Sequence, residues 1–245
     1  GSATVRPPFS GCDDFGLSAS MHPAKEVGGD FYDFFLIDQD HCGVVIADVS
    51  GKGVPAALFM MRVKALLNQL LREDLSPDQV LARANDGLCE DNEAGMFVTV
   101  WLGVLDLRSG KLVYANGGHN PPLYRHADGS VEWMRDRSGL LLGSFEGVPY
   151  RVFERTMIRG DSLILYTDGV TEAMDASDHC YGDERLFQLV ERECDGYPAS
   201  VSGVIEEDVR AFAEGADQAD DITLLVLRYD GQENGPAASA AGNRG

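Results

Sequence analysis

The sequence has few basic residues for its length. It contains 20 Lys and Arg against 40 Asp and Glu, a net charge of -20 over 245 residues. Proteins that bind nucleic acid need a basic surface that displaces counterions, and anionic lipid attracts the same kind of surface. The charge balance therefore argues against both partners. It suits a protein that concentrates cations, although most of these carboxylates are expected to be solvated surface.

Paired cysteines and long apolar runs are also missing. The five cysteines include no C-x-x-C pair, which argues against a disulfide framework and a zinc site and favours a reduced, cytoplasmic chain. No apolar run approaches the roughly 20 residues that span a bilayer, so we expect no direct membrane insertion. Gly1-Ser2 is typical of a tag remnant. A sensor domain or membrane anchor of a longer parent would then lie outside the sequence.

Several signatures of phosphate binding and covalent catalysis are absent. Gly51-Lys52-Gly53 lacks the glycine spacing and the Ser or Thr of a Walker loop, and no G-x-G-x-x-G occurs. No Ser or Cys lies in a nucleophile elbow, so covalent hydrolysis has no support. The acidic residues from 168 to 178 lack the alternating ligands and central Gly of a calcium loop.

The pattern of elements predicts one α+β domain over residues 11–230. Residues 1–10 are predicted to be a tag remnant and linker, and residues 231–245 a disordered tail. Strands joined by short turns, with four helices in two sequential pairs, predict mainly antiparallel sheet covered by helices. The first helix is expected over 54–71 and is apolar on much of its circumference, so it should be buried on more than one side or contact another subunit.

Four aspartates lie at the predicted edges of strands: Asp30, Asp48, Asp168 and Asp220. Carboxylate oxygens are ligands for Mg²⁺ and Mn²⁺, and two such ions close together can activate water and clamp a phosphoryl group. The alternative is that each aspartate only stabilises a turn. Spacing alone does not show that they converge. His119, in a Gly/Asn/Pro loop, could either move protons or stabilise the loop by a hydrogen bond.

Five segments, taken in order, resemble the bacterial PPM/PP2C-type serine/threonine phosphatases of the sporulation stage II E and RsbU-like branch. The similarity runs from about residue 20 to about residue 229. Each segment alone is a weak match to the family, and the occurrence of all five in order makes the match specific. They are Val27-Gly28-Gly29-Asp30-Phe31-Tyr32-Asp33, Ala47-Asp48-Val49-Ser50-Gly51-Lys52-Gly53-Val54-Pro55-Ala56-Ala57, Gly118-His119-Asn120-Pro121-Pro122, Tyr166-Thr167-Asp168-Gly169-Val170-Thr171-Glu172-Ala173 and Asp220-Asp221-Ile222-Thr223.

The resemblance implies a PP2C-like α-β-β-α sandwich, two packed antiparallel sheets flanked by pairs of helices. It implies two Mn²⁺ or Mg²⁺ ions, with Asp48 bridging both. Asp30 and the backbone carbonyl of Val49 would serve one ion, and Asp168 and Asp220 the other. A metal-bridging hydroxide would attack the phosphorus without a phosphoenzyme. In the last segment the family's ligand is the first acidic position, so Asp220 is preferred to its neighbour.

The sequence departs from eukaryotic relatives at two positions. They place a His, a proposed general acid, where this chain has Ser50. They also carry a phosphate-binding Arg before the first acidic segment, where the nearest cation here is Lys25. The leaving-group acid and the phosphate clamp are therefore open, with Lys52 and His119 as weak candidates.

The sequence thus predicts a metal-dependent phosphatase acting on phosphoserine or phosphothreonine. By resemblance, the substrate is a phosphorylated anti-sigma-factor antagonist. We further expect the helix at 54–71 to let a sensor domain or a homodimer partner switch activity by positioning the metal ligands. The rival interpretations are a non-catalytic binding module that keeps the fold, and a small-molecule phosphohydrolase that shares the chemistry.

Overall fold

Two five-stranded sheets lie face to face in the computed structural model, which describes residues 15–24 and 28–231. The predicted linker at 1–10, Lys25 and residues 232–245 of the predicted tail lie outside the described residues. One sheet has the order β1-β10-β9-β6-β7 and the other β2-β3-β4-β5-β8, and all neighbouring strands are antiparallel. The strands are β1 (Phe15–His22), β2 (Asp30–Leu36), β3 (His41–Val49), β4 (Val98–Asp106), β5 (Lys111–Gly117), β6 (Leu123–Arg125), β7 (Val131–Trp133), β8 (Phe153–Thr156), β9 (Ser162–Tyr166) and β10 (Ile222–Tyr229).

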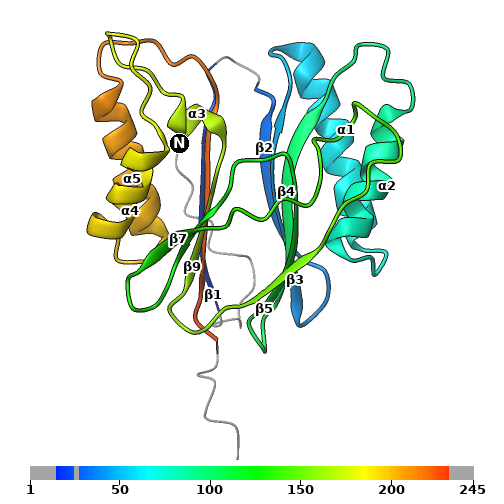
Figure 1. Cartoon of the computed structure of the whole chain (residues 1–245), viewed down its shortest axis with the longest axis horizontal. Coiled ribbons are helices and arrows are strands. Elements are labelled where there is room, and N and C mark those ends of the chain that lie inside the picture. The colour runs from blue at the N-terminus through cyan, green and yellow to red at the C-terminus, as the bar shows by residue number, and fades with distance from the viewer. Residues whose placement is uncertain (1–14, 25–27, 232–245) are drawn as a thin grey trace, which may run out of the picture.

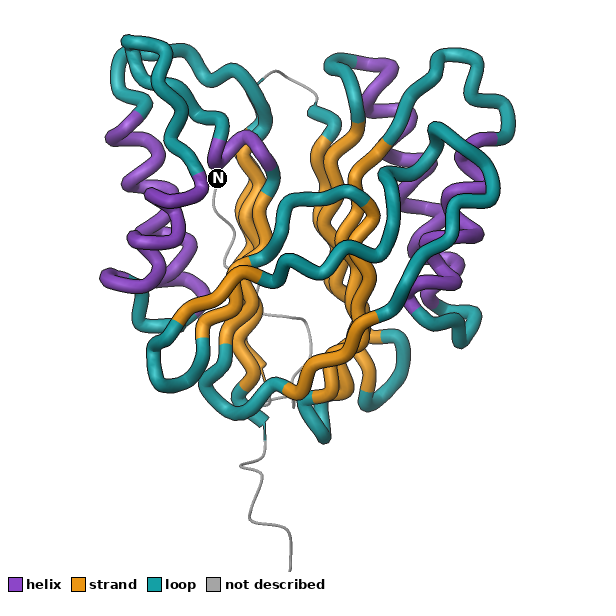
Figure 2. The backbone as a smooth tube through the Cα atoms, viewed as in Figure 1, coloured by secondary structure: helices purple, strands orange, loops and turns teal. Residues whose placement is uncertain are grey.

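A pair of helices covers the outer face of each sheet, so the molecule has four layers (Figures 1 and 2). Helices α1 (Val54–Leu71) and α2 (Pro77–Cys89) lie on the β2–β8 sheet. Helices α4 (Asp183–Glu193) and α5 (Pro198–Phe212) lie on the β1–β7 sheet. A short helix, α3 (Asp168–Thr171), follows β9 at one end of that sheet. The predicted α-β-β-α sandwich is confirmed, and only α3 was not anticipated.

Three apolar clusters hold the layers together. The central cluster fills the space between the two sheets and includes Trp101, Tyr124 and Tyr229, each fully buried. The second joins the β2–β8 sheet to α1 and α2, and the third joins the β1–β7 sheet to α4 and α5. Both faces of the inner strands are therefore buried, which explains apolar runs such as Val44-Val45-Ile46 that do not alternate with polar residues.

Local sequence explains where the helices begin. Pro55 and Pro77 stand in the first turns of α1 and α2, where a missing backbone N–H costs nothing. The backbone N–H of Ser76 donates to the side chain of Gln79 at 3.2 Å, as part of a capping box at the start of α2. Gly53 precedes α1 with a φ of 80°, a conformation that favours glycine.

Helix α1 is buried on one side and apolar on the other. Phe59, Val63 and Leu67 contact the core, whereas Val54, Leu58 and Met61 are 63–65% exposed. By length and composition α1 is the one helix among the described residues that could cross a membrane. Its packing against α2 and the sheet is the behaviour of a core helix with an unusually apolar outer stripe.

Candidate functional site

The four predicted aspartates come together at one end of the two sheets. Asp30 begins β2 and lies opposite Asp48 of β3 in the strand register. Asp168 begins α3, and Asp220 lies two residues before the strand β10. In Figure 1 the start of β2 and the helix α3 lie at the same end of the sandwich, one on each sheet. The fold thus unites residues that are almost 200 positions apart in the sequence.

Asp30 is buried and joins the two sheets. Its Oδ2 accepts hydrogen bonds from the hydroxyls of Thr167, at 2.6 Å, and Thr223, at 2.7 Å. Both threonines belong to the opposite sheet or its continuation, and the backbone N–H of Thr223 also donates to the Thr167 hydroxyl at 3.1 Å. Burial raises the pKa of Asp30 to about 7, and the two hydroxyls oppose that rise by stabilising the carboxylate.

Asp48 is the centre of the acidic group. Burial, followed by the charges of Asp30, Asp168 and Asp220, raises the pKa of Asp48 to about 9. Its carboxyl is also within hydrogen-bonding reach of Asp30 and Asp168. A carboxyl whose pKa is raised by three other charges lies near all three of them. Sequence spacing could not establish this convergence, and the fold provides it.

Asp168 and Asp220 form the opposite side of the group. Burial and the charge of Asp220 raise the pKa of Asp168. Asp220 is half exposed and pairs with Lys52, whose Nζ lies 3.4 Å from its Oδ2. The same Nζ donates to the carbonyl of Ala219 at 2.6 Å. Lys52 therefore links the turn after β3 to the loop before β10, across the mouth of the site.

These carboxylates are close but are not gathered into a finished ligand set. Among the described residues, no three His, Cys, Asp or Glu side chains form a ready-made metal-binding group. Asp48 nevertheless lies opposite Asp30 in the strand register, and the charges of Asp168 and Asp220 contribute to raising its pKa. Like charges repel one another, and a cation would remove that cost. The donors are all oxygens, which fits Mg²⁺ or Mn²⁺ better than softer metals.

The carbonyl of Val49 lies against the glycine pair that precedes β2. A Cβ at Gly29 would lie 2.8 Å from the Val49 oxygen, which is closer than real Cβ atoms come. The Val49 N–H also donates to the Gly29 carbonyl at 3.4 Å. Glycine at position 29 therefore lets the chain pass this carbonyl, the backbone group that the resemblance assigns to a metal.

Asp221 has a structural role that the sequence did not reveal. It is buried, and its carboxylate accepts backbone hydrogen bonds from Ala24 at 2.9 Å, Gly29 at 3.0 Å and Asp30 at 3.4 Å. A Cβ at Gly28 would lie only 1.8 Å from Asp221 Oδ2. The second aspartate of the pair thus fixes the segment that carries Asp30, while Asp220 faces the acidic group. In the sequence, the glycine pair at 28–29 was the feature that could have indicated a close contact here.

Ser50 and His119 are both engaged in hydrogen bonds that hold the structure. The Ser50 hydroxyl accepts from the Phe97 N–H at 2.9 Å. His119 is buried and connects the sheets: its Nε2 donates to the carbonyl of Tyr166 at 3.0 Å, and its Nδ1 accepts from the hydroxyl of Thr99 at 2.9 Å. Burial lowers the pKa of His119 to about 4, so the ring is neutral near pH 7. These contacts support the stabilising interpretation of His119 over a proton-transfer role.

A four-layer α-β-β-α sandwich with converging aspartates at one end of its two sheets defines the PP2C class of phosphatase domain. The chain belongs to the SpoIIE family, because the model for stage II sporulation protein E matches residues 38–230. It is 30% identical over 212 residues, 86% of its length, to the phosphoserine phosphatase RsbU of Bacillus subtilis, of which it covers 62%.

Solved structures agree with this fold. The PP2C domain of SiaA from Pseudomonas aeruginosa matches with a TM-score of 0.75 at 22% identity, covering 87% of this chain and 86% of that one. RsbX, solved in complex with magnesium, matches with a TM-score of 0.67 at 14% identity, covering 89% of this chain and 96% of that one. The chain spans 37% to 62% of the length of the curated relatives it matches.

Proposed function

We propose that this chain is a metal-dependent protein phosphatase domain that hydrolyses phosphoserine or phosphothreonine on a regulatory protein. The observation that carries the proposal is that Asp48 lies opposite Asp30 in the strand register and close to Asp168 and Asp220, at one end of the sandwich. Relationship to a phosphoserine phosphatase supports the reaction type. Retention of all four aspartates weighs against a non-catalytic binding module, because a degenerate site usually loses ligands.

In this proposal Asp48 is shared by two Mn²⁺ or Mg²⁺ ions. Asp30 and the Val49 carbonyl would hold one, and Asp168 and Asp220 the other. The strand register opposes Asp30 to Asp48, and the charge of Asp220 raises the pKa of Asp168, so both pairings are supported by proximity in the fold. When bound, such ions activate a water molecule and offset phosphoryl charge in an in-line displacement. Thr167 and Thr223 orient Asp30, and Asp221 holds the segment that carries it.

Lys52 is the cation best placed to meet substrate among the described residues of the site. Lys52 lies in the turn after β3, and its ammonium group already contacts Asp220 and the carbonyl of Ala219. It is 45% exposed at the side chain, so it could exchange a contact with Asp220 for a substrate phosphate oxygen. We therefore assign phosphate orientation to Lys52. The Ser50 hydroxyl accepts a hydrogen bond from the Phe97 N–H, and we give it no catalytic role.

Metal titration followed by a turnover assay tests the proposed function. We expect Mn²⁺ at about 100 times its Kd to stabilise the metal-free chain by about 3 kcal/mol, which raises the Tm by about 5–10 °C. It should also start hydrolysis of p-nitrophenyl phosphate and of a phosphoserine protein. Stabilisation without turnover on either substrate would favour the binding module. Turnover of phosphopeptides and small esters that exceeds that of every phosphoprotein would favour a small-molecule phosphohydrolase.

The substrate and the parent protein remain part of the proposal. By similarity to RsbU, we propose that the substrate is a phosphorylated anti-sigma-factor antagonist. We also propose that the reaction takes place in the cytoplasm. Because the chain spans less than two thirds of its curated relatives, we also expect a sensor domain in the parent chain.

The outer stripe of α1 is the proposed contact for that sensor domain or for a second copy. Val54, Leu58 and Met61 are exposed at helical spacing, and α1 begins a few residues after Asp48. We expect Leu58→Glu with Met61→Glu to leave the fold intact, because both side chains face solvent, and to alter oligomeric state or Mn²⁺ affinity. Light scattering and calorimetric titration measure these two properties. If neither changes, α1 has no switching role.

A further inference from the structure

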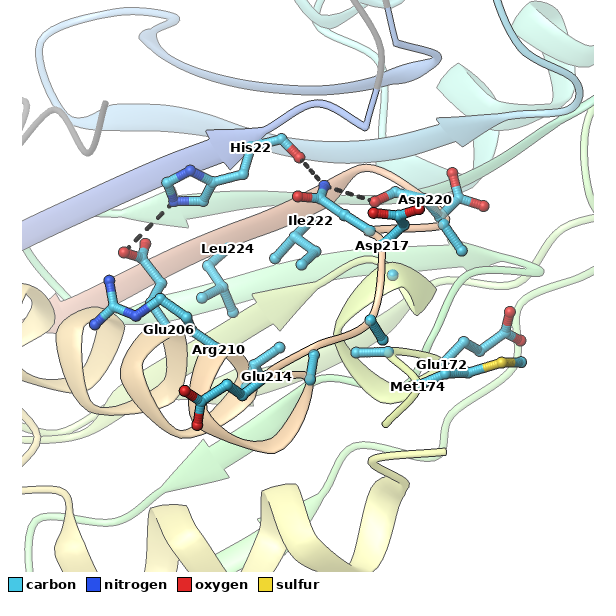
Figure 3. A pocket seen from close by; sticks show the side chains of 17 residues that line it. His22, Glu172, Met174, Glu206, Arg210, Glu214, Asp217, Asp220, Ile222 and Leu224 are labelled. Carbon is cyan, nitrogen blue, oxygen red and sulfur yellow. Dashed lines mark hydrogen bonds and ion pairs between the residues drawn. The ribbon is translucent and has the colours of Figure 1, made fainter. Parts of the chain in front are cut away.

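A cavity beside the acidic site has an apolar floor and an acidic rim. It measures about 470 Å³ and lies between α3, α5 and β10. The floor includes Val209 and Ala213 of the α5 region and Ile222 and Leu224 of β10. Figure 3 shows α5 on one side of the cavity, Glu172 and Met174 on the other, and the β10 side chains between them.

Carboxylates outnumber cations around this cavity. Five line it: Glu172, Glu206, Glu214, Asp217 and Asp220, against the cations Arg210 and, when protonated, His22. The pairing of charges is also incomplete. Glu206 Oε2 lies 3.5 Å from His22 Nε2, while Glu206 Oε1 is buried and has no hydrogen-bond partner among the residues that the structure describes. Glu214 and Asp217 are exposed at the rim and have no ion pair among the described residues.

The cavity is continuous with the proposed catalytic site. Asp220 belongs both to the cavity wall and to the acidic group, and Gly169, which also lines the cavity, directly follows Asp168 in the chain. A group bound in the cavity would therefore lie next to a phosphoserine held at the site. Gln218 stiffens the wall between them, since its side-chain amide donates to the carbonyls of His22 and Asp220 at 2.6 and 2.7 Å.

We propose that this cavity binds a lysine or arginine side chain of the phosphoprotein substrate, close in sequence to the phosphoserine. The inference rests on the proposed phosphatase function and adds a substrate preference to it. A long basic side chain places its methylene groups on apolar surface and keeps its charged end at a polar rim. The floor and the rim of the cavity match those two parts. The chain's net charge of -20 would otherwise repel an acidic partner, and a basic residue offsets this locally.

Synthetic phosphoserine peptides test the preference. In an otherwise constant peptide, one residue is varied as Lys, norleucine or Glu at each position from four before to four after the phosphoserine. We expect Lys to exceed norleucine in kcat/KM by about tenfold at one or two positions, and Glu to fall below both. Norleucine keeps the aliphatic stem, so the comparison isolates the charge.

A pair of charge-reversal variants locates the effect. Glu214→Lys with Asp217→Lys should abolish the Lys preference, while turnover of p-nitrophenyl phosphate, which lacks a basic side chain, should stay within about twofold of wild type. Glu191→Lys with Glu193→Lys, exposed on α4 and outside the cavity, changes the net charge equally and should keep the preference.

Three results would overturn the inference: no position at which Lys exceeds norleucine by more than about twofold, a preference that survives reversal at the rim, or one that the α4 variant abolishes equally. The cavity would then serve a different partner. Absence of Mn²⁺-dependent p-nitrophenyl phosphate turnover in the wild-type chain would instead count against the phosphatase proposal itself, so the two failures are distinguishable.

Discussion

Replacing Asp48 by Asn is expected to lower phosphatase kcat by at least about a thousandfold. The charges of all three other aspartates raise the pKa of Asp48, and in the proposed function Asp48 would help to hold both cations. Asparagine keeps the size of the side chain but removes a negative charge and one anionic oxygen. The affinity for both metal ions should therefore fall together, and calorimetric titration should show the loss of Mn²⁺ binding.

A stability measurement separates this effect from misfolding. Burial and the three neighbouring carboxylates make ionisation of Asp48 costly in the metal-free fold. Neutral Asn avoids that cost, so metal-free Asp48→Asn should be at least as stable as wild type and should gain no Tm from Mn²⁺. Asp33→Asn is a matched control, since Asp33 lies on β2 but bonds to Asn68 of α1 at 2.8 Å. Full activity of Asp48→Asn would contradict the metal assignment.

The metal-free protein is expected to lose about 2 kcal/mol of stability between about pH 7 and about pH 5 through His119 alone. The pKa of this buried histidine falls from 6.5 to about 4 in the fold. In the unfolded chain the ring takes up a proton below about pH 6.5, whereas in the fold it does so only below about pH 4. The unfolded state therefore binds more protons in this window, and stability decreases as pH falls through it.

The variant His119→Gln should lack the loss of stability that protonation of His119 causes between these two pH values. Its side-chain amide can still donate to the Tyr166 carbonyl, but it does not titrate. Urea unfolding of both proteins at the two pH values should show a smaller pH-dependent loss in the variant, by about 2 kcal/mol. The buried carboxyls contribute the opposite trend equally to both proteins, so the difference between them isolates the histidine. His179→Gln, at a side chain that is 75% exposed, should behave as wild type. An equal loss in wild type and His119→Gln would show that His119 titrates normally.

Much of the fold could be predicted because it depends on local patterns. The helix expected over 54–71 is present as α1 with those bounds, and the expected antiparallel sheets covered by two pairs of helices are present as well. The four-residue helix α3 was missed because one turn of helix has no periodic pattern to detect.

The candidate site was predictable only in part. Strand-end position and resemblance identified Asp30, Asp48, Asp168 and Asp220, but no spacing rule could show that they face one space. Asp221 was missed because its three backbone partners are about 190 positions away in the sequence. His119 could not be assigned between proton transfer and stabilisation until its burial between Thr99 and Tyr166 was known.

By itself, the sequence predicted the class of fold and the candidate aspartates and argued against nucleic-acid binding and covalent catalysis, because composition, periodicity and ordered segments are properties of the chain. Only the tertiary structure decided which carboxylates lie near one another and which of Asp220 and Asp221 faces the acidic group. It also decided that an apolar cavity with an acidic rim adjoins the candidate site. Burial and charge coupling depend on distances through space, and those distances arise only when the two sheets pack against each other.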